Sequence, residues 1–142
     1  MPISFLPEVR VIAVVGASRN PEKWGYKVFI TLRDKYPDIR VYPINPRAEK
    51  IAGSKAYPSL RELPEKPDMV VTVVPPEITE RIVEEAKKLG VKIIWMQPGS
   101  ESEKAIEEAE KAGIKVYHHT CIVQSSEASK IVPFRVSLTK ND

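Results

Sequence analysis

The sequence has little of what marks a secreted, membrane-spanning or nucleic-acid-binding protein. It contains one cysteine, Cys121, which excludes an internal disulfide and makes a cytoplasmic location the expectation. Its apolar runs fall far short of the roughly 20 residues that cross a bilayer, and its first residues lack the basic and apolar segments of a signal peptide. The 22 basic and 19 acidic residues are interspersed. This balance argues against nucleic acid and suits an anionic ligand.

Two nucleotide-binding fingerprints are also missing. No Gly-Lys-Ser or Gly-Lys-Thr follows a predicted strand, which excludes a P-loop. The dinucleotide fingerprint needs three closely spaced glycines and an acid after the second strand. Here no glycine stands between Gly16 and Gly25, and Asn45, with Arg47 nearby, takes the place of the acid. NAD is therefore disfavoured, while NADP, which carries an extra phosphate, stays open.

What the chain does have is a strand, a small-residue turn and a helix in succession. Residues 11–15 form a short apolar run rich in β-branched residues, which indicates a buried strand. A Gly-Ala-Ser turn follows at residues 16–18, and an amphipathic helix is predicted at residues 25–36. Glycine lets a phosphate approach the backbone, and the helix start offers free N–H groups. This layout is typical of the first unit of a nucleotide-binding sheet.

The rest of the chain repeats strands and helices. Further strands are predicted at residues 39–45, 69–74, 91–96 and 114–117, and further helices at residues 77–89 and 101–112. Alternation of this kind predicts an α/β fold, a Rossmann-like doubly wound parallel sheet of five strands with helices on both faces. The length fits one domain over residues 1–142. We expect the strand order 3-2-1-4-5, although Pro43 indicates an edge or a bulge in the second strand.

Smaller features complete the sequence-based picture. Residues 48–58 are expected to form a surface excursion, and residues 59–63 one helical turn with Ser59 as its cap. A lead-in at residues 1–8 and a short helix reaching about residue 130 are also expected. The alternating apolar residues at 132–138 could form an edge strand across a homodimer.

Four motifs at the carboxyl ends of predicted strands carry a family resemblance. They are Val14-Val-Gly-Ala-Ser18 with Pro21, Lys23 and Gly25; Val41-Tyr-Pro-Ile-Asn-Pro46; Val73-Val-Pro-Pro76; and Trp95-Met-Gln-Pro-Gly99. In this order and spacing the chain resembles the small single-domain coenzyme A-binding proteins, whose domain is similar to the CoA-binding domain of the succinyl-CoA synthetase α subunit. The resemblance covers about residues 8–130.

The resemblance implies a site for CoA or acyl-CoA at these turns. The first turn would line the phosphates, the second would hold the adenosine end, the third would pack on adenine or the pantetheine arm, and the fourth would close the pocket near the pantetheine. The expected ligand-binding residues are Gly16, Ala17, Ser18, Arg19, Lys23, Gly25, Asn45, Pro46, Arg47, Val74, Pro75, Pro76, Gln97, Pro98, Gly99 and Cys121. Taken singly, Pro75-Pro76 is also an ordinary helix start, and Gln97-Pro-Gly an ordinary turn.

The implied function is non-catalytic CoA binding, because the acidic residues lie on helices and no acid–base pair stands at the turns. Cys121 near a helix start is hypothesised to form a mixed disulfide with the CoA thiol. His118 and His119 are not expected to share a metal ion, because neighbours in a strand point to opposite faces. The alternatives are a subunit of an acyl-CoA synthetase-like enzyme, acting with a CoA-using partner, and an NADP-linked reductase. Intact small-residue turns speak against a regulatory domain that has lost its ligand.

Overall fold

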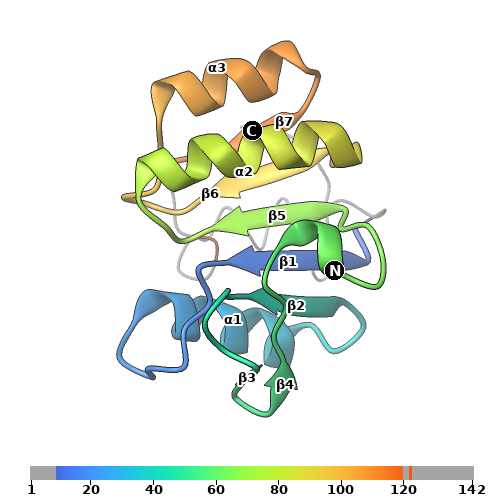
Figure 1. The fold of residues 1–142 in the computed structure, drawn as a ribbon, viewed down its shortest axis with the longest axis vertical. Coiled ribbons are helices and arrows are strands. Elements are labelled where there is room, and N and C mark those ends of the chain that lie inside the picture. The colour runs from blue at the N-terminus through green and yellow to red at the C-terminus, as the bar shows by residue number, and fades with distance from the viewer. Residues whose placement is uncertain (1–8, 120–121, 123–142) are drawn as a thin grey trace.

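A five-stranded parallel sheet forms the centre of the protein (Figure 1). The computed structural model describes residues 9–119 and 122. The strands lie in the order β2 (Arg40–Ile44), β1 (Val11–Val15), β5 (Met69–Thr72), β6 (Ile93–Met96) and β7 (Lys115–Tyr117). All four neighbouring pairs are parallel. The Rossmann-like α/β prediction is thereby confirmed.

The helices cover both faces of this sheet because side chains alternate along each strand. Helix α1 (Trp24–Lys35) packs its buried side chains with Ile12, Val14 and Trp95 on one face. Helices α2 (Pro76–Leu89) and α3 (Glu103–Lys111) pack on the other face, with Ala13 and Val15. Helix α2 ends as predicted at Gly90, which has the left-handed φ of 76°. None of the helices in the described residues has the length and apolar character to cross a membrane.

The predicted strand order 3-2-1-4-5 was wrong. Strand β5 pairs with β1, in the register Ile12 to Met69, and β2 lies at the edge of the sheet. Pro43 explains the position of β2. Proline has no N–H group to donate, and an edge strand needs backbone hydrogen bonds to a neighbouring strand on one side only. The four residues of β5 are fully buried, as a central strand requires. From β1 the chain therefore continues first to β2 on one side and later to β5 on the other side. Ligands of such sheets bind at the carboxyl ends of the two strands where this change of direction occurs.

Residues 48–58 are more than a surface excursion, which corrects that prediction. They form the hairpin of β3 (Lys50–Ile51) and β4 (Ser54–Lys55), with Ile51 and Ala56 buried in the core beside α1. Ala52 and Gly53 both have positive φ, 50° and 82°, as a tight hairpin turn requires. The helical turn that follows is the 3₁₀ helix η1 (Leu60–Glu62), but the Ser59 side chain does not cap it, so the predicted cap was wrong.

Other predictions lie outside the described residues. These are the lead-in at residues 1–8, the helix reaching about residue 130, the edge strand at residues 132–138 and the placement of Cys121.

Candidate functional site

The candidate site lies at the edge of the sheet where the parallel strands end (Figure 1). Backbone hydrogen bonds bind the turns there to one another. The amide of Gly16 donates to the carbonyl of Ile44 at 3.2 Å, and that of Val73 donates to Val15 at 2.8 Å. The amide of Gln97 donates to the carbonyl of Thr72 at 3.0 Å. The turns after β1, β2, β5 and β6 therefore meet at one edge, as the sequence predicted.

Two glycines set the shape of the first turn. Gly16 has a φ of 95°, and a Cβ atom added to it would lie 2.3 Å from the carbonyl oxygen of Val73. A Cβ atom on Gly25 would lie 2.0 Å from the carbonyl oxygen of Gly16. The first turn thus sits directly against the end of β5, and the start of α1 sits directly against the turn. Gly25, predicted as a ligand contact, serves this packing.

The first turn leaves several donors available to an anion. The Ser18 oxygen accepts a hydrogen bond from the Asn20 amide at 3.0 Å, so the Ser18 hydroxyl hydrogen can still be donated. Helix α1 starts after Lys23 with no side-chain cap and with no acidic residue in its first turn. The positive end of its dipole is therefore uncompensated. Ala17 differs from the rest, because its side chain is buried in the core.

Three cations stand beside these donors. Arg19 and Lys23 are exposed on either side of the loop before α1, and Arg47 is exposed in the turn after β2. None of the three forms an ion pair with the described part of the chain. Their charges are therefore free to attract a phosphate.

Asn45 joins the first two turns through its side chain. Its amide nitrogen donates to the carbonyl of Ala17 at 2.8 Å, and its oxygen accepts from the Arg47 amide at 2.7 Å. Asn45 was predicted to hold the adenosine end of the ligand. Its hydrogen bonds instead position the neighbours that could do so, the exposed Pro46 and Arg47.

The third and fourth turns present mostly apolar surface. Val74 packs over Gly16, with its Cγ1 atom 2.7 Å from the position of an added Cβ. Pro75 is the N-cap of α2 and Pro76 its first residue, so the helix-start interpretation is confirmed. Both prolines are exposed at the site edge.

Gln97, predicted to close the pocket near the pantetheine, makes a hydrogen bond within the fold. Its side chain is 3% exposed and accepts a hydrogen bond from the Ile122 amide at 2.8 Å. It therefore holds the segment after β7 in place, whereas Pro98 and Gly99 are exposed. The turn is fixed further by the Ser100 hydroxyl, which lies 2.8 Å from the Gln97 carbonyl oxygen.

Trp24 is a candidate residue that the sequence interpretation missed. It is the first residue of α1 and is 47% exposed, the large apolar side chain most open to solvent in the described chain. The ammonium of Lys27 lies 5.2 Å from the centre of its ring. The available signal was a tryptophan directly before a glycine at a predicted helix start.

Contrary to the prediction from the sequence, the two histidines do not point to opposite faces of a strand. His118 and His119 follow β7, and His119 has a φ of 63°, so the backbone is not extended there. Their rings lie 4.6 Å apart, and their Nδ1 atoms contact each other. The His119 amide donates to Glu101. Burial opposes ionisation of Glu101, but hydrogen bonds from Gly99 and its other neighbours hold its pKa below the usual value. Within residues 9–119 and 122 no group of three potential ligands surrounds a metal position.

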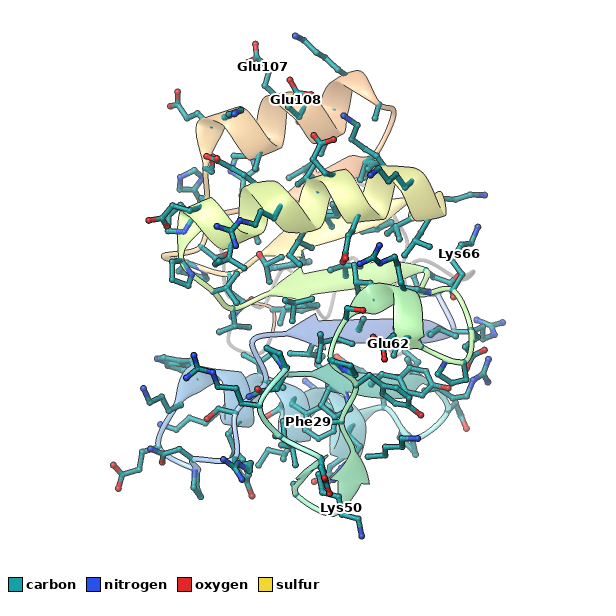
Figure 2. All side chains as sticks on the ribbon, in the orientation of Figure 1. Phe29, Lys50, Glu62, Lys66, Glu107 and Glu108 are labelled. Atoms are coloured by element: carbon teal, nitrogen blue, oxygen red, sulfur yellow. The ribbon has the colours of Figure 1, made fainter. Side chains whose placement is uncertain are left out.

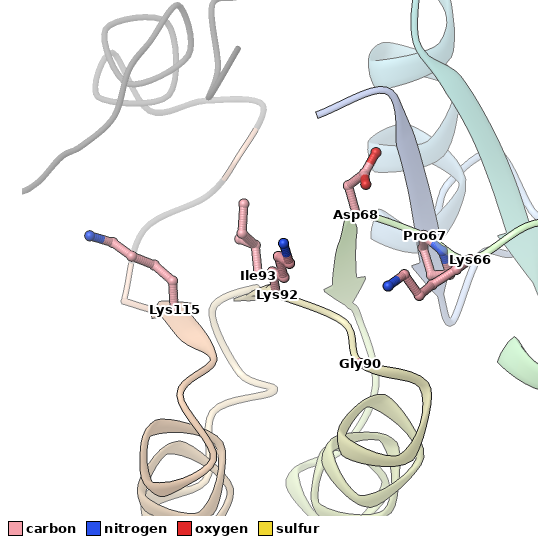
Figure 3. A pocket seen from close by; sticks show the side chains of 7 residues that line it. All are labelled: Lys66, Pro67, Asp68, Gly90, Lys92, Ile93 and Lys115. Atoms are coloured by element: carbon pink, nitrogen blue, oxygen red, sulfur yellow. The ribbon is translucent and has the colours of Figure 1, made fainter. Parts of the chain in front are cut away.

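A second hollow lies at the opposite end of the sheet (Figure 3). It measures about 370 Å³ and is lined by Lys66, Pro67, Asp68, Gly90, Lys92, Ile93 and Lys115. Helix α2 ends at Gly90 with the negative end of its dipole, which basic side chains stabilise. The Asp68 carboxylate accepts from the amides of Arg10 and Val11. The Asp68 carboxylate therefore has a structural role, and the lysines lie at the end of the sheet opposite to the turns that carry the family resemblance, so the carboxyl edge is the better candidate.

Several known proteins are similar to this chain in sequence and in fold. The α subunit of ADP-forming acetate–CoA ligase II from Pyrococcus furiosus is 43% identical over 83 residues, 58% of this chain and 18% of the subunit. A conserved hypothetical protein from the same organism superposes with a TM-score of 0.74 at 43% identity, covering 80% of this chain and 97% of that one. The dinucleotide-forming acetyl-coenzyme A synthetase 1 of Candidatus Korarchaeum cryptofilum, solved with phosphate and ADP, superposes with a TM-score of 0.69 at 33% identity. The superposition covers 79% of this chain and 25% of the synthetase.

The chain thus spans less than a fifth of the ligase subunit and a quarter of the synthetase. The family described as "CoA binding domain" matches residues 10–126, which include all four turns of the site. This chain belongs to the CoA-binding domain family.

Proposed function

We propose that this chain binds CoA or acyl-CoA at the carboxyl edge of the sheet and has no catalytic activity of its own. The observation that carries the proposal is the first turn. Gly16 and Gly25 bring the backbone close to β5 and to the uncapped start of α1, and Arg19 and Lys23 have no ion-pair partner in the part of the chain that the structure describes. A pyrophosphate carries the charge and the acceptor oxygens that these donors and cations can bind.

The pantetheine arm would then run over the apolar turns. The side chains of Val74, Pro75 and Pro76 form an apolar wall, and the two prolines have no N–H group, which suits a chain of methylene and amide groups. The Cys121 thiol is proposed to lie near the thiol end of the ligand, because the sequence places it four residues after β7. A cytoplasmic location, where free CoA and a reduced cysteine coexist, is part of the same proposal.

The test is parallel calorimetric titration with CoA, dephospho-CoA and NADPH. We expect CoA to bind and the Arg19→Ala/Lys23→Ala variant to bind it about a hundredfold more weakly, since two lost charge-assisted contacts at about 1.5 kcal/mol each sum to about 3 kcal/mol. The matched control is Lys92→Ala/Lys115→Ala, which loses the same charge at the far hollow. Tighter binding of NADPH, or equal losses in both variants, would overturn the assignment.

A role as the CoA-binding part of an acyl-CoA synthetase-like assembly is the second candidate. The observation that favours it is the similarity to ADP-forming ligases, of which this chain covers only a small share. The chain alone, given acetyl-CoA, ADP and phosphate, is expected to form no ATP. Formation of ATP would show that it is catalytic. Formation only after a partner subunit is added would favour the assembly.

A further inference from the structure

Two lysines face each other across the β3–β4 hairpin. Lys50 and Lys55 are directly opposite in the antiparallel register, and both are exposed. Like charges in that position destabilise a strand pair. Neither lysine forms an ion pair with residues 9–119 or 122, and the Lys55 ammonium lies 5.1 Å from the centre of the Tyr57 ring. The hairpin therefore presents two neighbouring positive charges without an ion-pair partner among the described residues.

The hairpin that holds these lysines is fixed to the rest of the fold. Ile51 is fully buried on the face opposite to Lys50. The Arg33 guanidinium donates to the carbonyl of Ala52 at 2.7 Å and to the Ser54 hydroxyl at 3.1 Å. At the other end, the Tyr57 amide donates to the carbonyl of Pro43 in β2. The lysines are thus presented from an anchored edge, and Figure 2 shows Lys50 projecting from it away from the sheet.

A shallow hollow connects the hairpin with the candidate site. It measures about 480 Å³, and both lysines line it together with Asn45 and Pro46 of the second turn. Glu49 is on the same wall. The cation Arg47 follows directly after Pro46, so three cations and one carboxylate surround the place where the second turn meets the hairpin.

We propose that Lys50 and Lys55 bind the 3′-phosphate of the CoA nucleotide, a conclusion that rests on the proposed CoA-binding function. A dianionic phosphate between them would remove the repulsion across the hairpin. It also matches the ammonium group, which binds phosphate as a point charge without demanding a planar geometry. The hairpin then forms the outer wall of the nucleotide subsite, and the lysine pair distinguishes CoA from dephospho-CoA. Glu49 opposes the phosphate and limits its affinity.

The test compares CoA with dephospho-CoA for the wild type and for Lys50→Ala/Lys55→Ala. We expect the variant to bind CoA about tenfold more weakly and dephospho-CoA unchanged, because only CoA has the phosphate that the lysines contact. The control is Lys92→Ala/Lys115→Ala, which has the same net charge and should retain the wild-type preference. Glu49→Gln should bind CoA more tightly, again without a change for dephospho-CoA.

The outcomes separate this inference from the function it rests on. If the wild type binds CoA but the lysine variant keeps the full preference for CoA, the lysine assignment is wrong and the function stands. Equal losses in the lysine variant and in the control would mean that net charge acts at long range, which also refutes the assignment. If the wild type binds neither CoA nor dephospho-CoA, the proposed function itself fails. Lys50→Ala/Lys55→Ala is expected to fold, since it removes a repulsive pair from exposed positions.

Discussion

Replacing Gly16 by alanine should destabilise the protein through two separable effects. The first is the backbone, because a φ of 95° costs a residue with a side chain about 1–2 kcal/mol. The second is overlap, because the new methyl group would lie 2.3 Å from the carbonyl oxygen of Val73 and 2.7 Å from a methyl group of Val74. Overpacking of this kind costs about 1–3 kcal/mol. The sum, about 2–5 kcal/mol, is a large share of the about 5–15 kcal/mol that stabilises a typical domain.

Gly99 provides the matched control for the first effect. It has the same φ of 95°, but an added Cβ atom would meet nothing within 4 Å. Its hydrogen bond to Glu101 uses the backbone amide, which alanine retains. Gly99→Ala should therefore cost only about 1–2 kcal/mol. The difference between the two variants measures how tightly the first turn packs on β5.

Equilibrium unfolding in urea measures both free energies. Trp95 is fully buried in the core cluster that also holds Ala17 of the turn and the buried side chains of α1, so its fluorescence reports loss of that core. The two variants should share the wild-type dependence on urea and differ only in midpoint. Equal losses of stability at Gly16 and Gly99 would show that the turn does not press against β5. The account of a preformed phosphate-binding turn would then lose its main support.

Two further predictions concern single side chains. The Arg40 guanidinium and the Tyr42 hydroxyl hydrogen-bond Glu65 and lower the pKa of its carboxyl from 4.5 to about 2. The pair therefore stabilises the fold above pH 4.5, and this contribution is lost as the pH falls toward 2. Glu65→Gln should unfold with a weaker acid dependence over that range, and an unchanged acid titration would contradict this. Incubation with CoA and diamide, which accepts the two thiol hydrogens, should add the mass of one CoA to the wild type and not to Cys121→Ser. Equal addition to both proteins would exclude Cys121.

The elements were predictable from the sequence because their patterns are local, whereas the strand order depends on long-range pairing. Short apolar runs that contain valine or isoleucine located β1, β5 and β6. Which strands pair depends on which of them can be buried on both sides in the middle of the sheet. Pro43 already indicated that β2 could hydrogen-bond to a neighbouring strand on one side only. Weighing that proline above the general doubly wound order would have placed β2 at the edge.

The β3–β4 hairpin was not predicted from the sequence for a different reason. Its strands have only two residues each, too few for any alternation to be recognised. Its stability comes from tertiary contacts, the burial of Ile51 and the Arg33 hydrogen bonds to the turn. Lys50 and Lys55 are neighbours only through the hairpin register, which the sequence pattern does not reveal.

The candidate site also shows why residue type alone could not assign roles within it. Asn45 and Gln97 are the polar side chains that a sequence motif favours as ligand contacts, yet their hydrogen bonds go to the backbone of neighbouring turns. The groups left for a ligand are amides at a helix start, the Ser18 hydroxyl and exposed cations. Recognition built from such groups selects for phosphates and their spacing more than for the chemistry of an acyl group. On the proposed CoA-binding function, a site built from these groups would admit both CoA and its acyl esters.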